Sequence, residues 1–212
     1  SFGFFIFIIP MKKIITCIAL VSLFSCKAQN IVAYDSDESF FKKNSGEYYK
    51  DTHNFFNTFE GEWKWVNTAT NSSLTFIFKK EENLSSARGY TYDLLVGEYK
   101  YVENGNELAN TLLLINNTNI SGHLHKISGM IILKKRAKPE CSECVENERR
   151  LQVSIDHQND DRVQGNMVMR RFVENGVPKI KAIIYDGSKL SMNPNAPEYI
   201  VIPFGEYILT KQ

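Results

Sequence analysis

The chain has 212 residues, with 25 lysines and arginines against 24 aspartates and glutamates. This balance excludes the strongly basic face that nucleic-acid-binding proteins usually present, so we expect no nucleic-acid partner. The length fits one domain, and the 10 tyrosines and 14 phenylalanines suit a core built from β-strands.

The chain begins with the features of an export signal. A basic start, Met11-Lys12-Lys13, precedes an apolar run over residues 14–24 that is too short to span a bilayer. The run ends in a lipobox, Leu23-Phe24-Ser25-Cys26. We therefore expect cleavage before Cys26 and acylation of this cysteine, which would anchor the mature protein to a membrane. The alternative is an ordinary cleaved signal followed by an unmodified cysteine.

These features divide the chain into three expected parts. Residues 1–25 form the signal, in which residues 1–10 precede the expected translation start at Met11. Residues 26–52, the lipidated cysteine and a polar stretch without a clear period, form a flexible tether. Residues 53–212 form a single β-domain. The signal removes two lysines and no acidic residue, which leaves 23 basic and 24 acidic residues in the mature chain.

From residue 55 onward, apolar and polar residues alternate with the period of two that is typical of half-buried strands. Trp63 and Trp65 share one face of the first expected strand, and Phe76 and Phe78 share one face of the second. Tyr92 occupies the corresponding face of the third. These five aromatic side chains are expected to line the interior of the domain.

Two Asn-Gly pairs predict tight hairpin turns, because these residues tolerate positive φ angles. Asn104-Gly105 is expected to lead into a strand at 112–115, and Asn175-Gly176 into a strand at 180–185. Further strands are expected over 127–133, 151–157, 163–172 and 199–209. Eight to ten strands without a helix of three turns predict an all-β fold. An antiparallel up-and-down barrel is favoured, with a β-sandwich as the alternative.

Two patterns resemble known families. Phe59-Glu60-Gly61-Glu62-Trp63 resembles the first strand of lipocalin-like barrels, in which the tryptophan closes the base of the barrel. A wider pattern resembles a group of small uncharacterised lipoproteins of Bacteroidetes. It comprises Cys26-Lys27-Ala28-Gln29, the Phe-x-Gly-x-Trp-x-Trp strand, and Cys141-x-x-Cys144 before Glu148-Arg149-Arg150. The wider resemblance implies a location and a fold, not an activity.

Cys141 and Cys144 are the cysteines of the expected β-domain. An exported protein meets oxidising conditions, so we expect a disulfide that staples a polar loop. Redox activity and metal binding are the alternatives, although a redox Cys-x-x-Cys normally begins a helix beside a βαβ unit. His123 and His125 would share one side of a strand and are weak candidates to complete a zinc site with the cysteines. We assign no metal and no cofactor.

No catalytic motif is recognisable, so we assign no catalytic residue. The sequence has no Gly-x-Ser-x-Gly elbow, His-Glu-x-x-His motif, phosphate-binding glycine loop or dinucleotide fingerprint. His157 continues the apolar face of residues 151–155 and is expected to be a core or rim residue.

The expected protein is a monomer at the outer membrane, facing the periplasm or the cell surface. We expect it to bind a small apolar ligand inside the barrel, unless its own side chains fill that space. The alternative is a protein-interaction module, an inhibitor or envelope accessory protein, that acts through its loops. An enzyme ranks third.

Overall fold

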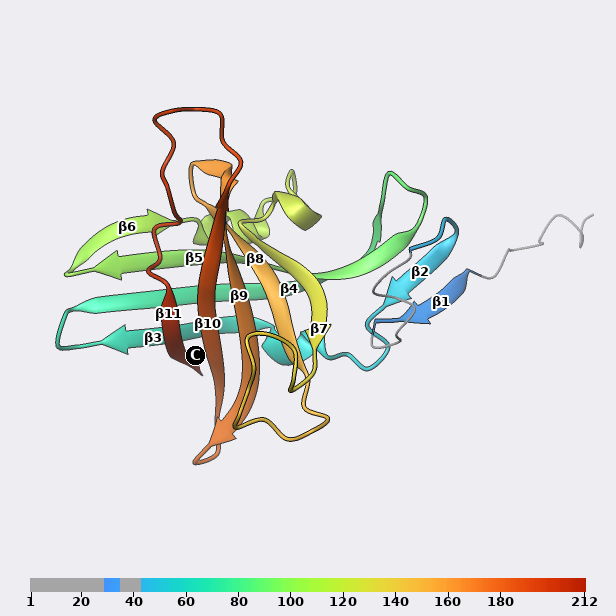
Figure 1. The fold of residues 1–212 in the computed structure, drawn as a ribbon, viewed down its shortest axis with the longest axis horizontal. Helices are drawn as coiled ribbons and strands as arrows, with labels where there is room; N and C mark the ends of the chain where they lie inside the picture. The colour runs from blue at the N-terminus through green and yellow to red at the C-terminus, as the bar shows by residue number, and fades with distance from the viewer. Residues whose placement is uncertain (1–28, 35–42) are drawn as a thin grey trace, which may run out of the picture. The chain divides into compact units, whose positions relative to one another are not determined.

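The computed structural model describes residues 29–34 and 43–212 (Figure 1). Residues 31–212 form one compact unit; of the other unit, residues 1–30, only Gln29 and Asn30 are described. The expected signal and Cys26 lie outside the described residues. Within the described part of the chain, no helix has both the length and the apolar character needed to cross a membrane.

Eleven strands and three short 3-10 helices make up the described fold. The strands are β1 (Asn30–Ala33), β2 (Glu47–Lys50), β3 (Gly61–Asn67), β4 (Ser72–Ser85), β5 (Thr91–Glu103), β6 (Asn106–Asn110), β7 (Ile127–Leu133), β8 (Arg150–His157), β9 (Asp160–Glu174), β10 (Val177–Lys189) and β11 (Gly205–Lys211). The helices are η1 (Phe56–Phe59), η2 (Leu112–Asn116) and η3 (Gly122–Leu124).

Eight of these strands close into a ring. In the order β3, β4, β5, β7, β8, β9, β10, β11, each strand pairs with the next, and β11 returns to β3. Every pairing in the ring is antiparallel. The all-β class and the up-and-down order predicted from the sequence are therefore confirmed. In Figure 1, β3, β4 and β5 run across the direction of β8, β9 and β10.

Three strands lie outside the ring. β6 forms a hairpin with β5, β2 runs parallel to the start of β5, and β1 follows β2 in the sheet order. The parallel β2–β5 pair makes the sheet mixed. Residues 30–33 and 47–50, which the sequence suggested were part of a flexible tether, are strands because their backbone groups pair with neighbouring strands.

Both Asn-Gly turns are confirmed by positive φ angles, 51° and 81° at Asn104-Gly105 and 52° and 78° at Asn175-Gly176. The strand predicted at 112–115 is wrong, because the first hairpin returns through β6 and the apolar run forms η2. The last strand begins at Gly205 rather than at residue 199. Residues 199–204 belong instead to the loop that joins β10 to β11 at one end of the ring.

Side chains that point into the ring form the main hydrophobic core. Trp63 is fully buried, and its indole N–H donates to the carbonyl oxygen of Phe59 at 2.6 Å. Phe59 and Phe56 belong to η1, which closes this end of the ring. Ile200 and Ile202, from the loop between β10 and β11, are buried in the same core at the opposite end.

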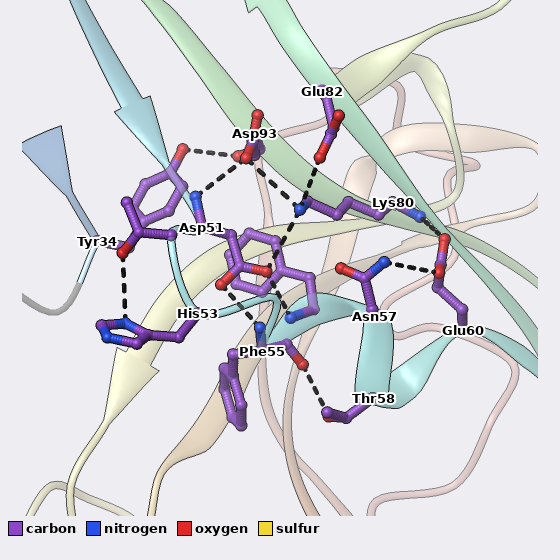
Figure 2. A network of polar contacts seen from close by, with 12 residues as sticks. Tyr34, Asp51, His53, Phe55, Asn57, Thr58, Glu60, Lys80, Glu82 and Asp93 are labelled. Atoms are coloured by element: carbon purple, nitrogen blue, oxygen red, sulfur yellow. Dashed lines mark hydrogen bonds and ion pairs between the residues drawn. The ribbon is translucent and has the colours of Figure 1, made fainter. Parts of the chain in front are cut away.

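A buried ion network fastens β2 and η1 to the ring (Figure 2). The Lys80 ammonium lies 3.6 Å from the Asp51 carboxylate, 3.7 Å from that of Asp93 and 2.8 Å from that of Glu82. Asp51 also accepts hydrogen bonds from the backbone N–H groups of Phe55 and Phe56, each at 2.8 Å. One cation of β4 thus holds the segment that precedes the first ring strand.

Candidate functional site

The five aromatic residues predicted to bind a ligand occupy three separate places. Trp63, Phe76 and Phe78 lie inside the ring, where at most 2% of each residue is exposed. Their rings fill the interior together with the apolar side chains of the facing strands. Trp65 is only partly buried, near the end of the ring that Ile200 closes.

Tyr92 is not inside the ring. It packs with Leu94 and Val96 in a second, smaller core on the outer face of β5, which Tyr49 of β2 and Ile115 of η2 cover. Side chains alternate between the two faces of a strand, so Asp93 and Leu95 point the other way. The structure therefore does not bring Tyr92 together with the two tryptophans.

Trp65 lines an open pocket of about 490 Å³ at the end of the ring. Tyr101, Phe204 and Tyr207 complete an aromatic wall, and we call this site the mouth pocket. The rings of Trp65 and Tyr207 meet edge to face, with 5.1 Å between their centroids. Tyr101 and Tyr207 are buried, whereas Trp65 and Phe204 are accessible to solvent. Aromatic side chains of this kind are the usual lining of small-molecule sites.

The polar side of the mouth pocket is acidic. The Tyr101 hydroxyl donates to the Glu103 carboxylate at 3.0 Å, and the Tyr207 hydroxyl donates to the carbonyl oxygen of Pro203 at 2.7 Å. Burial, with the Glu103 hydrogen bond, raises the pKa of Tyr101. Burial, with the Glu103 charge, raises the pKa of Tyr207 to about 12. Both phenols therefore stay protonated at neutral pH and hold fixed positions in the wall.

Sequence reasoning identified only Trp65 among these four aromatic residues. Tyr101 continues the alternation of β5, two residues after the fully buried Tyr99, so a signal for it was present. Phe204 reaches the pocket from the loop between β10 and β11, which the sequence pattern presented as part of a strand, whereas Tyr207 lies on β11 itself.

The sequence suggested that the two candidate histidines lie on a strand, but in the structure neither does. His123 lies in η3, and its ring stacks on Tyr92 with 6.0 Å between the ring centroids. His125 is buried, with Nδ1 2.9 Å from the Glu98 carboxylate and Nε2 3.4 Å from that of Glu81. In the described ranges 29–34 and 43–212, no three His, Cys, Asp or Glu side chains are grouped to hold a metal ion.

Cys141 and Cys144 form the predicted disulfide, which lies in the loop of residues 134–149 between β7 and β8. A cavity of about 230 Å³ lies between this loop and the outer face of the sheet. Two ion pairs lie at this cavity: Lys181 is 2.6 Å from the Glu143 carboxylate, and Arg170 is 2.6 Å from the Glu148 carboxylate. We therefore favour the mouth pocket over this cavity as a ligand site.

His157 is a buried core residue, and burial lowers its pKa. Its Nδ1 accepts the backbone N–H of Asn159 at 3.2 Å, in the turn before β9. This contact orders the hairpin.

The neighbouring Asp156 carries the clearest pH dependence of the ring. Burial, followed by the negative charge of Asp161, raises the pKa of Asp156 to about 6. The folded chain therefore binds this proton more tightly than the unfolded chain, and the free energy of unfolding falls as the pH rises from about 4 through 6.

Asp156→Asn should remove this fall in the free energy of unfolding. The amide oxygen can still accept the 2.9 Å hydrogen bond from the Gln164 side chain. We expect urea unfolding at pH 8 to show a gain of about 1 kcal/mol, after allowance for solvent screening, and little change at pH 4. A variant that is less stable than the wild type at pH 8 would contradict this assignment.

Fold and site define an all-β protein with a filled, eight-stranded antiparallel ring and a ligand-sized pocket at one end of it. The chain belongs to a family of unknown function (DUF6705), whose model matches residues 11–212. No curated protein and no solved structure matches the chain.

Proposed function

We propose that this chain is a non-enzymatic binding protein that holds a small, largely apolar ligand in the mouth pocket. The observation that carries the proposal is the wall of Trp65, Tyr101, Phe204 and Tyr207 around an open volume of about 490 Å³. This volume lies within the range of small-molecule sites, about 300–1,000 Å³. The Glu103 carboxylate supplies one directional acceptor, which favours a ligand that carries a hydrogen-bond donor.

The filled interior supports this position for the ligand. Trp63, Phe76 and Phe78 already contribute to a close-packed core. Opening a ligand-sized cavity there would lower the free energy of unfolding by several kcal/mol, because packing contacts would be lost. The mouth pocket needs no such rearrangement, since it is already open and Phe204, 43% exposed, and the partly buried Trp65 reach the surface there.

We further propose that the protein is an exported lipoprotein of the Bacteroidetes cell envelope, anchored to the outer membrane through Cys26. The order of basic start, apolar run and lipobox cysteine over residues 11–26 supports this location. A ligand-binding domain on a lipid anchor would capture its ligand close to the membrane surface.

Native mass spectrometry of the full protein, purified from the envelope of its own host, tests the binding function. The wild type should carry the mass of one small molecule. Trp65→Ala should reduce the occupancy at least about tenfold, equivalent to about 1.4 kcal/mol, because it removes the largest aromatic wall.

Val66→Ala is the matched control. Val66 lies next to Trp65 on β3, is 54% exposed, and points to the opposite face of the strand. This variant should keep the ligand. A bare wild-type mass, or equal occupancy in Trp65→Ala, would count against the proposal.

A protein-interaction module is the second candidate, favoured by the loop that joins β10 to β11. This loop exposes 70% of Leu190, 92% of Met192 and 57% of Tyr199. A protein partner in the same spectra, lost in a Leu190→Ser/Met192→Ser variant, would favour this function over small-molecule binding.

A further inference from the structure

Four tyrosine rings surround the ammonium group of Lys43. Its Nζ lies 5.7 Å from the ring centroid of Tyr34, 5.5 Å from that of Tyr49, 5.4 Å from that of Tyr90 and 5.6 Å from that of Tyr92. We call these four rings the tyrosine cage. A cation within about 6 Å of an aromatic centroid is attracted by the negative face of the ring.

The rings hold one another in place. Tyr90 meets Tyr49 edge to face at 5.6 Å and packs against Tyr92 at 5.9 Å. The Tyr34 hydroxyl donates to the backbone carbonyl oxygen of Asp93 at 2.6 Å. Tyr49 and Tyr92 are buried and form the floor, whereas Tyr34 and Tyr90 are partly exposed. The cage is therefore held together by its own contacts, and two of its four rings are accessible to solvent.

A primary ammonium is a poor match for this site. Lys43 has three N–H donors, and the hydrogen bond that it forms within the described residues goes to the Met130 sulfur at 2.9 Å, a weak acceptor. Among these residues no carboxylate pairs with it, and burial lowers the pKa of Lys43. A lysine ammonium is strongly hydrated, so burial without good acceptors costs free energy that four aromatic faces only partly offset.

We propose that the tyrosine cage is a binding site for a trimethylammonium group, and that Lys43 occupies it until such a ligand displaces it. A quaternary ammonium has no N–H groups to satisfy, and aromatic faces are its usual recognition element in proteins. The cage thus fits the ligand better than it fits the lysine.

Displacement of Lys43 does not require the backbone on its C-terminal side to move. The backbone on its C-terminal side is held independently: the Asn44 N–H donates to the Tyr49 hydroxyl at 2.8 Å, and the Gly46 N–H donates to the Gly89 carbonyl oxygen at 2.8 Å. The cage can therefore exchange its occupant without unfolding β2.

The cage is separate from the mouth pocket. The two sites share no residue, and Tyr92 and Tyr101 lie nine positions apart on β5, a separation of about 30 Å along a strand. Failure of one proposal therefore leaves the other standing.

Calorimetric titration of the full protein with choline chloride, against sodium chloride at the same concentrations, tests the cage. Lys43→Ala should bind choline about tenfold more tightly than the wild type, because a lysine that fills the cage about nine-tenths of the time lowers the apparent affinity by that factor. Lys43→Ala/Tyr90→Ala should lose this binding. Lys50→Ala is the matched control, since among the described residues Lys50 lies over one ring, that of Tyr48 at 5.6 Å, which is not part of the cage. It should bind like the wild type.

The trimethylammonium group could belong to a free molecule or to a lipid headgroup. Lys43→Ala should therefore also be tested with phosphatidylcholine vesicles, with phosphatidylglycerol vesicles for comparison. Binding to choline alone supports a free ligand, and preferential binding to phosphatidylcholine supports a headgroup. Binding to neither, or equal choline affinity in the wild type and Lys43→Ala, overturns the proposal.

The wild type provides a second test that does not depend on the folding of any variant. Saturating choline should speed tryptic cleavage after Lys43, because the displaced side chain becomes accessible, and should leave cleavage after Lys50 unchanged. Unchanged cleavage after Lys43 at saturating choline would show that the lysine stays in the cage and would overturn the proposal.

Discussion

Lys80→Met is expected to lower the free energy of unfolding by about 3–5 kcal/mol. The side chains of Lys80, Asp51 and Asp93 are 3%, 2% and 0% exposed, respectively (Figure 2). Removing the ammonium leaves two buried carboxylates without their shared cation. Removing one partner of a buried ion pair destabilises a protein strongly, because the remaining charge stays buried without compensation. Glu82 adds little to the loss, because 56% of its side chain is exposed and can be hydrated.

Urea unfolding at pH 7 measures the loss, and Lys79→Met is the matched control. Lys79 is the neighbouring residue on β4, is exposed, and should change the free energy of unfolding by no more than about 0.5 kcal/mol. Combining Lys80→Met with Asp51→Asn should lower the free energy of unfolding by less than the sum of the two single changes. The double variant leaves one buried carboxylate without a cation, whereas Lys80→Met alone leaves two. Equal effects of Lys79→Met and Lys80→Met would mean that the network contributes nothing.

The same variant should show where the stability is lost. Asp51 connects β2 to η1 by accepting the N–H groups of Phe55 and Phe56, so these amides should lose hydrogen-exchange protection first. The strands on the far side of the ring, such as β9 and β10, should lose protection later.

The sequence predicts the inner face of the ring where one face of a strand is buried and the other is wet. Trp63 follows this rule, since the residues that flank it, Glu62 and Lys64, are polar and exposed. It fails for Tyr92, because residues 92–99 of β5 are all buried. A strand covered on both faces carries no pattern that says which face points inward.

The cage and the mouth pocket depend on contacts that no local pattern encodes. Lys43 sits in a polar stretch without a period, and the rings around it come from β2, β5, the residue before β5 and the residue after β1. Phe204 lines the same pocket as Trp65, 139 residues earlier in the sequence, because the chain returns to this end of the ring. Short apolar runs such as 112–115 are ambiguous between strand and helix, and tertiary packing decides.

The second large loss of stability is expected from Arg150→Met, which acts on the loop of residues 134–149 that carries the disulfide. Arg150 is 2% exposed, and its guanidinium donates to four backbone carbonyl oxygens of this loop. These belong to Lys134 at 2.9 Å, Lys135 at 3.3 Å, Ala137 at 2.8 Å and Pro139. Hydrogen bonds to a charged group contribute about 1.5–3 kcal/mol each, and they do not add fully. We therefore expect Arg150→Met to lower the free energy of unfolding by about 3–4 kcal/mol.

The disulfide should matter less than this one arginine. Cys141 and Cys144 are three positions apart, so their bond closes a short loop and removes little chain entropy, equivalent to about 2 kcal/mol. Cys141→Ala/Cys144→Ala should accordingly be more stable than Arg150→Met in urea. Arg150→Lys should not restore the wild-type value, because an ammonium cannot reproduce the planar fork that reaches four carbonyls.

The rate of tryptic cleavage measures how accessible the loop itself is, since it contains four potential cleavage sites, Lys134, Lys135, Arg136 and Lys138. Cleavage there should accelerate more in Arg150→Met than in the double cysteine variant. Arg136→Met is the matched control for stability, because 83% of the Arg136 side chain is exposed and its ion pair with Glu146 lies at the surface. If the double cysteine variant were the less stable and the faster cleaved, the covalent staple would dominate. The loop would then depend on oxidation to stay folded, whereas a loop held by Arg150 keeps its position against β8 in either redox state.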